Sequence, residues 1–166
     1  VLAELKDSPS HYYTREERSF DLLLHLTFST APLFLNKKEE EYQISKSSMD
    51  EDMRRLRSDI NKYGLEIISL GKKGLCLNGS ERAIRTMIFD SINQRIGIVD
   101  LNNDHQDAIP YQLLFHYVDK EILLKINRLL KQIMGQKQND LYSSQILLFA
   151  AIWLRRLKMN ELITMV

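Results

Sequence analysis

Cysteine is nearly absent from this chain of 166 residues, which contains only Cys76. One thiol cannot build a disulfide framework or a zinc site of paired cysteines. The chain also lacks the run of roughly 18 apolar residues that a membrane-spanning helix needs, and no signal-peptide pattern opens it. Its first residue, Val1, is not methionine, so we expect an interior piece of a longer protein. Together these features predict a cytoplasmic protein without a membrane segment.

Excess charge and catalytic motifs are also missing. Lys and Arg number 23 against 22 Asp and Glu, which gives a net charge of +1. Without a strong basic excess, any nucleic-acid affinity must be local, and we expect it to need dimerisation or a further domain. The four histidines, His11, His25, His105 and His116, are scattered, and no HExxH, GxSxG or glycine-rich phosphate loop occurs. We therefore predict a protein that is not an enzyme and has no cofactor or metal.

The segment from Ile44 to Gly79 carries the clearest pattern in the chain: a turn, an amphipathic helix and a hairpin. Ser45 or Ser47 can cap the helix, because a serine hydroxyl accepts from the exposed N–H groups of the first turn. Met49, Met53, Leu56 and Ile60 then recur at helical spacing and predict one buried stripe. The residues expected to reach a ligand from the other side are Lys46, Ser47, Ser48, Glu51, Arg54, Arg55, Ser58 and Lys62.

The hairpin follows directly, with Gly71-Lys72-Lys73-Gly74 between two short apolar strands. Two glycines supply the positive φ angles of a tight turn, and Lys72 and Lys73 lie at its tip. A helix followed by such a hairpin is typical of a winged helix-turn-helix, in which the helix enters the DNA major groove and the wing meets phosphates. Ordinary solvated surfaces also carry such residues. The acidic side chains Asp50, Glu51, Asp52 and Asp59 would repel the phosphates of DNA.

The fold class that we predict is mainly α with a small β-hairpin wing. A capping box of Thr14 and Glu17 opens a helix through about Ser29. A short helix covers about Lys37 to Tyr42, and Ser80 caps another that ends near Arg95. We divide the chain into a linker (1–13), a winged helix-turn-helix domain (14–96), a connector (97–112) and a partial helical domain (113–166).

The connector contains Asp100, Asn102 and Asp104, which match the first ligand positions of a calcium loop. His105 replaces the glycine of that loop and Tyr111 its last glutamate, so we predict no calcium site. Beyond the connector, helices over 113–134 and 142–157 are expected to form a packed hairpin. Its apolar contacts would come from Ile122, Ile126, Leu129, Leu130, Ile133, Ile146, Phe149, Ala150, Trp153, Leu154 and Leu157.

The runs SKSSMDEDMRRLRSDINKYGLEI and KKGLCLNGSERAIR resemble the second helix-turn-helix unit of bacterial regulators that carry phosphotransferase-system regulation domains, or PRDs. That family includes BglG/LicR-type activators of carbohydrate operons and, more distantly, Mga-like virulence regulators. The resemblance covers about residues 14–95, with Gly74, Gly79, Glu81 and Arg85 in the family's places. It implies a sequence-specific transcription regulator that binds double-stranded DNA as a homodimer.

The run SSQILLFAAIWLRRL resembles a helix of the first PRD, on which the family carries a histidine that accepts phosphate from sugar-transport phosphocarriers. Here Phe149 stands in that place, while Arg156 matches the arginine that comes after it. Phenylalanine cannot take a phosphoryl group, so we predict no phosphoacceptor on this helix. His116 is the nearest other histidine and the remaining candidate. Input from phosphotransferase-system phosphocarriers would then come through PRDs outside this chain.

A second function stays open at this point. The near-neutral charge and the acidic residues beside the arginines also fit a winged-helix module that mediates dimerisation or domain docking, while another unit contacts DNA. RNA antitermination, also found among PRD proteins, requires a separate RNA-binding domain that this sequence does not show.

Overall fold

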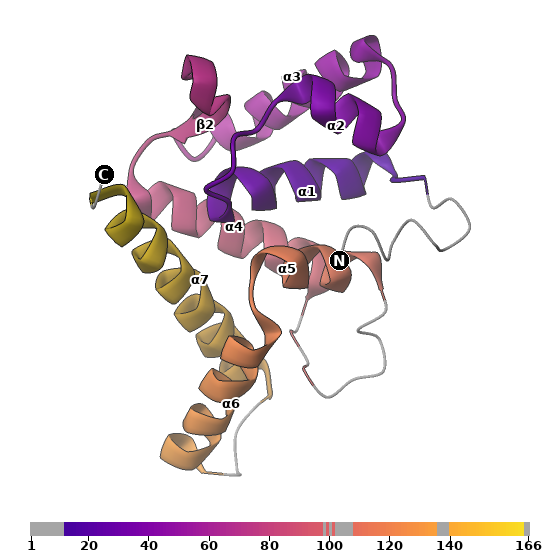
Figure 1. Cartoon of the computed structure of the whole chain (residues 1–166). Helices are drawn as coiled ribbons and strands as arrows, with labels where there is room; N and C mark the ends of the chain where they lie inside the picture. Colours follow the sequence, from indigo (N-terminus) through magenta and orange to yellow (C-terminus); the bar gives the residue numbers. More distant parts are fainter. Residues whose placement is uncertain (1–11, 98, 100, 102–107, 136–139, 165–166) are drawn as a thin grey trace.

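The computed structural model of the chain describes residues 12–97, 99, 101, 108–135 and 140–164 (Figure 1). The helices and strands follow in the order α1 (Arg15–Phe28), α2 (Leu35–Tyr42), α3 (Lys46–Asn61), β1 (Glu66–Ser69), β2 (Leu75–Asn78), α4 (Glu81–Ile96), α5 (Ile109–Tyr117), α6 (Lys120–Met134) and α7 (Asp140–Thr164). The first three helices and the hairpin form the upper part in Figure 1, and α6 and α7 project below it. This confirms the predicted fold class.

Helix α1 is the central helix of the upper part. The predicted capping box is present: Glu17 N donates to Thr14 Oγ1 over 3.2 Å, and Thr14 N donates to Glu17 Oε2 over 2.8 Å. From Phe20 to Phe28 nearly every side chain is buried, and the helix packs against α3, α4, α5 and α7. A helix that is buried on nearly all sides belongs to a core. Helix α1 is therefore the element on which both the wing and the later helices α4, α5 and α7 pack.

Helix α2 is polar, and a buried carboxylate fixes its position. Asp21 of α1, only 3% exposed, accepts from Lys38 Nζ over 2.6 Å and from the Tyr42 hydroxyl. The Tyr117 hydroxyl of α5 donates to the other oxygen over 2.9 Å. Burial, together with the negative charge of Asp21, raises the pKa of both tyrosines, which favours the protonated hydroxyls that donate to this carboxylate. One paired charge thus joins α1, α2 and α5.

The hairpin pairs β1 with β2 in antiparallel register, from Glu66 opposite Asn78 to Ser69 opposite Leu75. The loop before α2 adds a further rung, because Leu75 N donates to Leu33 O over 2.9 Å. At Gly74, where φ is +69°, a Cβ would lie 2.2 Å from Leu33 O. Only glycine allows this approach. The wing is therefore joined to the loop between α1 and α2 as well as to its own neighbours in sequence.

The helices after the wing differ from prediction in three places. Ser80 caps α4 as predicted, accepting from Ala83 N over 3.1 Å. However, α5 begins at Ile109, inside the predicted connector, and α7 runs from Asp140 to Thr164 rather than over 142–157. The prediction of a single helix over 113–134 is wrong, because Val118 and Asp119 separate α5 from α6. Asp119 caps α6 by accepting from Glu121 N over 2.8 Å, as aspartate does at helix starts.

The apolar stripe predicted for α6 and α7 is also wrong in part. Six of its members are large exposed side chains: Leu129, Ile133, Phe149, Trp153, Leu154 and Leu157. The buried side of α7 contains Leu147, Leu148, Ala151 and Ile152, and this helix packs against α1, α4 and α6. The positions considered for calcium, Asp100, Asn102, Asp104 and His105, lie outside the described residues, as does His11.

Candidate nucleic-acid interface

Helix α3 turns its apolar stripe inward, as predicted. Met49, Met53, Leu56 and Ile60 are each buried, and α3 packs against α1, α2 and β1. Of the eight predicted site residues on or just after this helix, six are exposed and two, Ser48 and Glu51, are partly exposed. The exposed six are Lys46, Ser47, Arg54, Arg55, Ser58 and Lys62. The structure therefore presents these side chains together on the outer side of one helix.

The start of α3 is a cluster of hydroxyls. Ser45 Oγ accepts from Ser48 N over 3.2 Å and lies 3.0 Å from the Oγ atoms of both Ser47 and Ser48. The capping residue is thus Ser45, the first of the two predicted candidates. The backbone N–H groups and the helix dipole at this end favour an anion, and Lys46 adds a formal positive charge. This end of the helix suits a phosphate oxygen.

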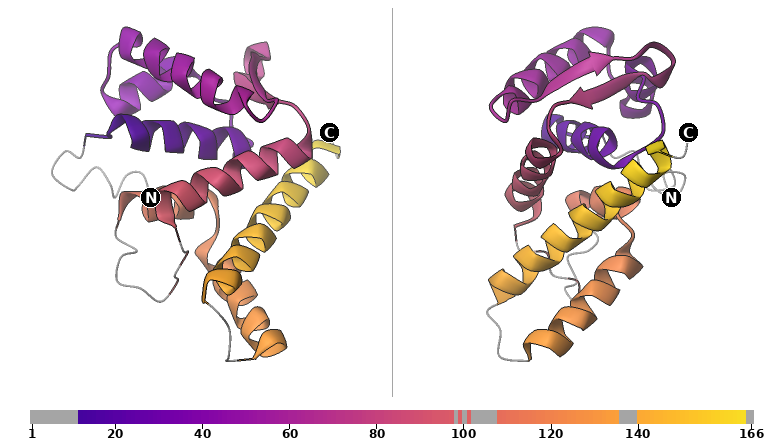
Figure 2. Two further views of the ribbon diagram at one scale, coloured as in Figure 1. Left: turned by 180° about the vertical axis from the view of Figure 1, so that it is seen from behind. Right: turned by 90° about the vertical axis from the view of Figure 1, so that its left-hand side faces the viewer.

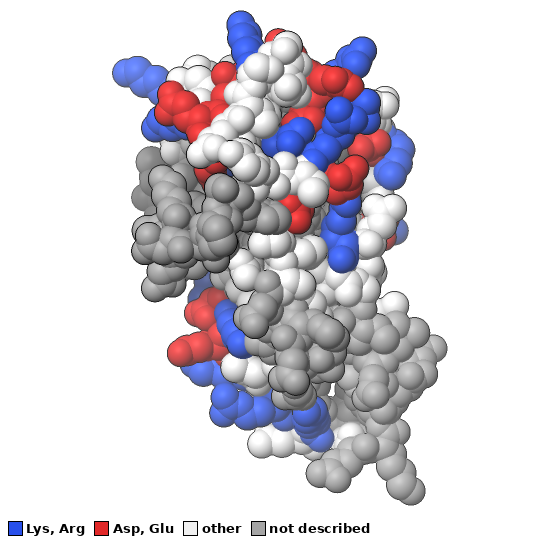
Figure 3. Space-filling model, turned by 90° about the vertical axis from the view of Figure 1, so that its right-hand side faces the viewer, with Lys and Arg blue, Asp and Glu red and all other residues white. Residues whose placement is uncertain are grey.

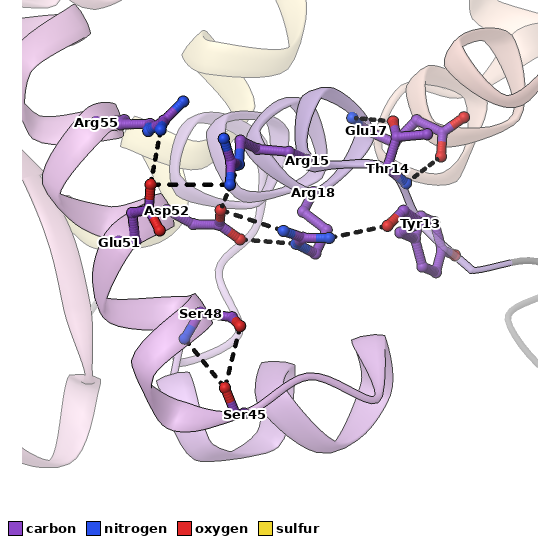
Figure 4. Close-up of polar contacts among 10 residues, drawn as sticks. All are labelled: Tyr13, Thr14, Arg15, Glu17, Arg18, Ser45, Ser48, Glu51, Asp52 and Arg55. Atoms are coloured by element: carbon purple, nitrogen blue, oxygen red, sulfur yellow. Dashed lines mark hydrogen bonds and ion pairs between the residues drawn. The ribbon is translucent and has the colours of Figure 1, made fainter.

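The carboxylate of Glu51 is paired with arginine side chains of the protein itself. Its Oε1 atom lies 2.6 Å from Arg55 Nη2 and 3.8 Å from Arg15 Nη2 (Figure 4). The hydrogen bond from Arg55, with the charge of Arg15, lowers the pKa of the Glu51 carboxyl, which stays ionised. Glu51 thereby holds Arg55. Neighbouring Arg54, in contrast, forms no hydrogen bond or ion pair with another described residue.

Asp52 joins α3 to α1 and does not reach the surface. Arg18 Nε lies 2.7 Å and Arg18 Nη2 3.2 Å from the two carboxylate oxygens, and Arg15 Nε lies 3.6 Å away (Figure 4). The sequence interpretation counted Asp52 among the acidic residues facing DNA. Its spacing from Met49 and Leu56, three and four residues, already places it beside the buried stripe. Asp50 and Asp59 are exposed, as that interpretation assumed.

The wing carries Lys72 and Lys73 exposed at its tip, within a short 3-10 turn from Gly71 to Lys73. The predicted positive φ angles occur at Gly71 and Gly74. Arg57, which the sequence interpretation did not single out, donates from Nη1 to the carbonyl of Ile67 in β1. This bond joins the body of α3 to the wing. Helix α3 is therefore joined directly to strand β1 of the wing, against which it also packs.

The charges on this part of the molecule are mixed. In Figure 3, Lys and Arg side chains alternate with Asp and Glu over the upper part, where no patch of one sign dominates. Lys62, beyond the end of α3, holds its ammonium group 5.2 Å from the centre of the Tyr63 ring. A surface of mixed charge of this kind produces no strong long-range field.

Phe149 and His116, the two positions considered for phosphorylation, have different surroundings. Phe149 is 48% exposed and stacks on Phe89 of α4, with ring centres 4.1 Å apart. Its neighbour Trp153 lies under Arg85, whose guanidinium carbon is 4.5 Å from the ring centre. His116, at the end of α5, is exposed and meets Tyr117 edge to face. Within the described ranges, no three His, Cys, Asp or Glu side chains gather as a metal site.

Helix α2, the turn before α3, helix α3 and the two-stranded wing have the arrangement of a winged helix-turn-helix. A family model described as the Mga helix-turn-helix domain matches residues 6–91, just over half of the chain. The chain therefore belongs to this family of DNA-binding transcription regulators, which confirms the Mga-like part of the resemblance. Comparison with curated proteins and with solved structures gives no significant match. No helix in the described part is long and apolar enough to cross a bilayer.

Proposed function

We propose that the outer face of α3 and the wing tip bind double-stranded DNA together. Arg54, Ser58, Lys46 and Ser47 would meet base edges and phosphates in the major groove, and the Lys72-Lys73 tip would meet the flanking backbone. The observation that carries this proposal is the pairing of an exposed polar helix face with a lysine-tipped wing, joined by the Arg57 bond to Ile67. This link between α3 and β1 would fix the spacing between the groove contacts and the backbone contacts.

The remaining predicted residues take supporting roles. Glu51 orients Arg55 through its 2.6 Å ion pair, so Arg55 approaches DNA already positioned. The hydroxyl of Ser48 belongs to the cap of the helix, and Lys62 supplies a phosphate contact beyond its end. Arg54 then supplies the base contact, since no described partner competes for its guanidinium.

The finer proposal concerns regulation. Residues 113–166 resemble the front of a PRD, and this supports a cytoplasmic regulator of a carbohydrate-utilisation operon with PRD-type input. Because phenylalanine occupies position 149, phosphotransferase-system phosphocarriers would act through PRDs outside this chain. Homodimerisation would double the contact surface, which a net charge of only +1 makes necessary for tight binding.

The rival function is a docking or dimerisation module that does not contact DNA. Asp50 and Asp59, exposed among the cations of α3, favour it. The two functions differ in one measurable property, the salt dependence of DNA binding. A protein that releases counterions from phosphates loses affinity linearly on a log-log plot as salt rises.

The test replaces Lys72 and Lys73 by alanine in the full chain and measures binding to a duplex of random sequence by fluorescence anisotropy across a salt series. Loss of two phosphate contacts should weaken binding and reduce the log-log slope by roughly two. The matched control replaces Lys125 and Lys131, two exposed lysines of α6, and makes the same change in net charge. If the wing variant, like the control, has the affinity and slope of the unaltered protein, the wing tip does not contact phosphates and the proposed interface is wrong. Absence of salt-dependent DNA binding by the unaltered protein would favour the docking function.

A further inference from the structure

A cavity of about 780 Å³ lies at the elbow between α5 and α6, with α7 along its other side. Its floor is apolar: Val118 and Ala151 are buried, and Phe115 and Ile122 are partly buried. Leu154 of α7 forms part of the exposed edge. This volume is within the range of about 300–1,000 Å³ that is usual for small-molecule sites in proteins.

The rim of the cavity is cationic. Lys120, Arg155 and Lys158 line it together with the imidazole of His116, against a single carboxylate, Asp119. That carboxylate is already engaged, since Asp119 Oδ1 accepts from Glu121 N at the start of α6. The ammonium of Lys120 lies 5.5 Å from the centre of the Phe115 ring, at the border between rim and floor. A ligand in this cavity would meet positive charge at its edge and hydrocarbon inside.

Arg155 carries a polar atom that is buried without a partner. Its Nη2 atom donates to Phe28 O over 2.7 Å, but its Nε atom has no hydrogen-bond partner within the described part of the chain. Buried donors in proteins are nearly always paired, and a charged donor left unpaired needs a specific reason. This Nε atom is also closed to a water-sized molecule, so a ligand in the cavity would meet the remaining, cavity-lining part of the Arg155 guanidinium.

We propose that this cavity binds a small amphipathic anion. Its carboxylate or phosphate group would accept from Arg155 and lie near Lys158, and its apolar body would cover Val118, Ala151 and Ile122. This chemistry follows from the arrangement of the lining. A purely polar anion would leave the floor bare, and a neutral apolar molecule would leave the positive charges of Arg155 and Lys158 without a counter-charge.

The site is connected to the central helix of the winged unit at two points. Tyr117 lines the cavity and donates to Asp21 in the middle of α1, and Arg155 donates to the carbonyl of Phe28, the last residue of the same helix. A ligand on Arg155 would alter the bond that it makes to α1. An effect on DNA affinity results if the ligand favours one position of α1, and this effect alone rests on the proposed function.

The test is calorimetric titration of the full chain, without DNA, using octyl phosphate and octanoate as probes. Octanol and inorganic phosphate serve as controls that carry one feature each. We expect an amphipathic probe to bind at least tenfold more tightly than either control, and Lys158→Gln to weaken that binding about tenfold, the usual effect of losing a charged hydrogen bond. Lys125→Gln, an exposed α6 lysine outside the lining, should leave it unchanged.

Equal affinity for octanol and octyl phosphate, or an affinity that Lys158→Gln does not alter, would overturn the proposal. The preference between octyl phosphate and octanoate identifies the head group. A separate anisotropy titration with DNA, in saturating probe, tests the connection to α1. An unchanged DNA affinity there would overturn only that connection, and a failure of the DNA proposal would leave the calorimetric result standing.

Discussion

Arg156 of α7 forms a two-point ion pair with Glu81, the first residue of α4: Nε to Oε1 is 2.9 Å and Nη2 to Oε2 is 2.6 Å. The third nitrogen, Nη1, donates to Thr27 O near the end of α1 over 2.7 Å. Figure 2, left, shows α7 rising from α6 to the beginning of α4, where the wing ends. Since Glu81 lies three residues after the last residue of β2, the pair fixes the base of the wing to α7.

The first prediction concerns this contact. Arg156→Gln should destabilise the fold by about 1–3 kcal/mol, because it leaves partly buried partners of a charged donor unsatisfied. It should also weaken DNA binding through the wing. The measurement is a double-mutant cycle with Lys72→Ala/Lys73→Ala, in which the effect of Arg156→Gln should largely disappear. Equal losses with and without the wing lysines would exclude this route. Arg128→Gln, on α6, is the control.

The second prediction is a pH dependence of stability. The hydrogen bond from Arg156 lowers the pKa of Glu81 below its usual value near 4.5. A carboxyl with a depressed folded-state pKa stabilises the fold above the unfolded value, and this contribution is lost as pH falls through the folded value. Urea denaturation should therefore show a large difference between the unaltered protein and Glu81→Gln at pH 7. The difference should shrink below pH 4.5, whereas a constant difference would contradict the ion pair.

The third prediction tests the orientation of α3. Leu56→Ala should reduce the free energy of unfolding by about 2–5 kcal/mol, because the leucine is fully buried and its truncation leaves a cavity. Ser58→Ala, two residues later on the exposed side, should change it by less than about 0.5 kcal/mol. Thermal denaturation of both variants is sufficient. Similar melting temperatures would mean that the helix faces the other way.

The fourth prediction concerns phosphorylation. Incubation of the chain with the general phosphotransferase carriers should leave it unlabelled, since phenylalanine stands at position 149 and offers no acceptor atom. Mass spectrometry without acid treatment preserves phosphohistidine, and the carriers themselves show that the reaction works. Acid-labile phosphate at His116 or His105 would contradict the prediction and assign direct sensing to this chain.

Local signals in the sequence were enough to predict the winged part. The Thr14 and Glu17 capping box, the Met49 to Ile60 stripe and the two hairpin glycines each act within a few residues of themselves, and each occurs as predicted. DNA contact by the exposed residues of α3 stays a prediction. Such contact depends on a second molecule, and a local pattern in this sequence carries no information about that molecule.

The failures have two physical causes. Helix α7 is apolar around its whole circumference from Ile146 to Leu154, so periodicity could not select the side that is buried. The buried carboxylates were missed because their partners are distant in sequence: Asp52 lies 34 residues from Arg18, and Asp21 lies 96 residues from Tyr117. A charged residue looks solvated until the tertiary structure brings its partner to it.

The carboxylate of Asp21 also sets the smallest fragment that should fold and bind independently. The family match ends at residue 91, but Asp21 takes one of its three donors from Tyr117, well past that boundary. A protein cut after α4 would retain Lys38 and Tyr42 and lose the third donor, together with the cover that α5 gives to α1. The natural unit of this regulator is therefore longer than its helix-turn-helix domain, and α5, a helix outside the bounds of the family match, completes the winged part.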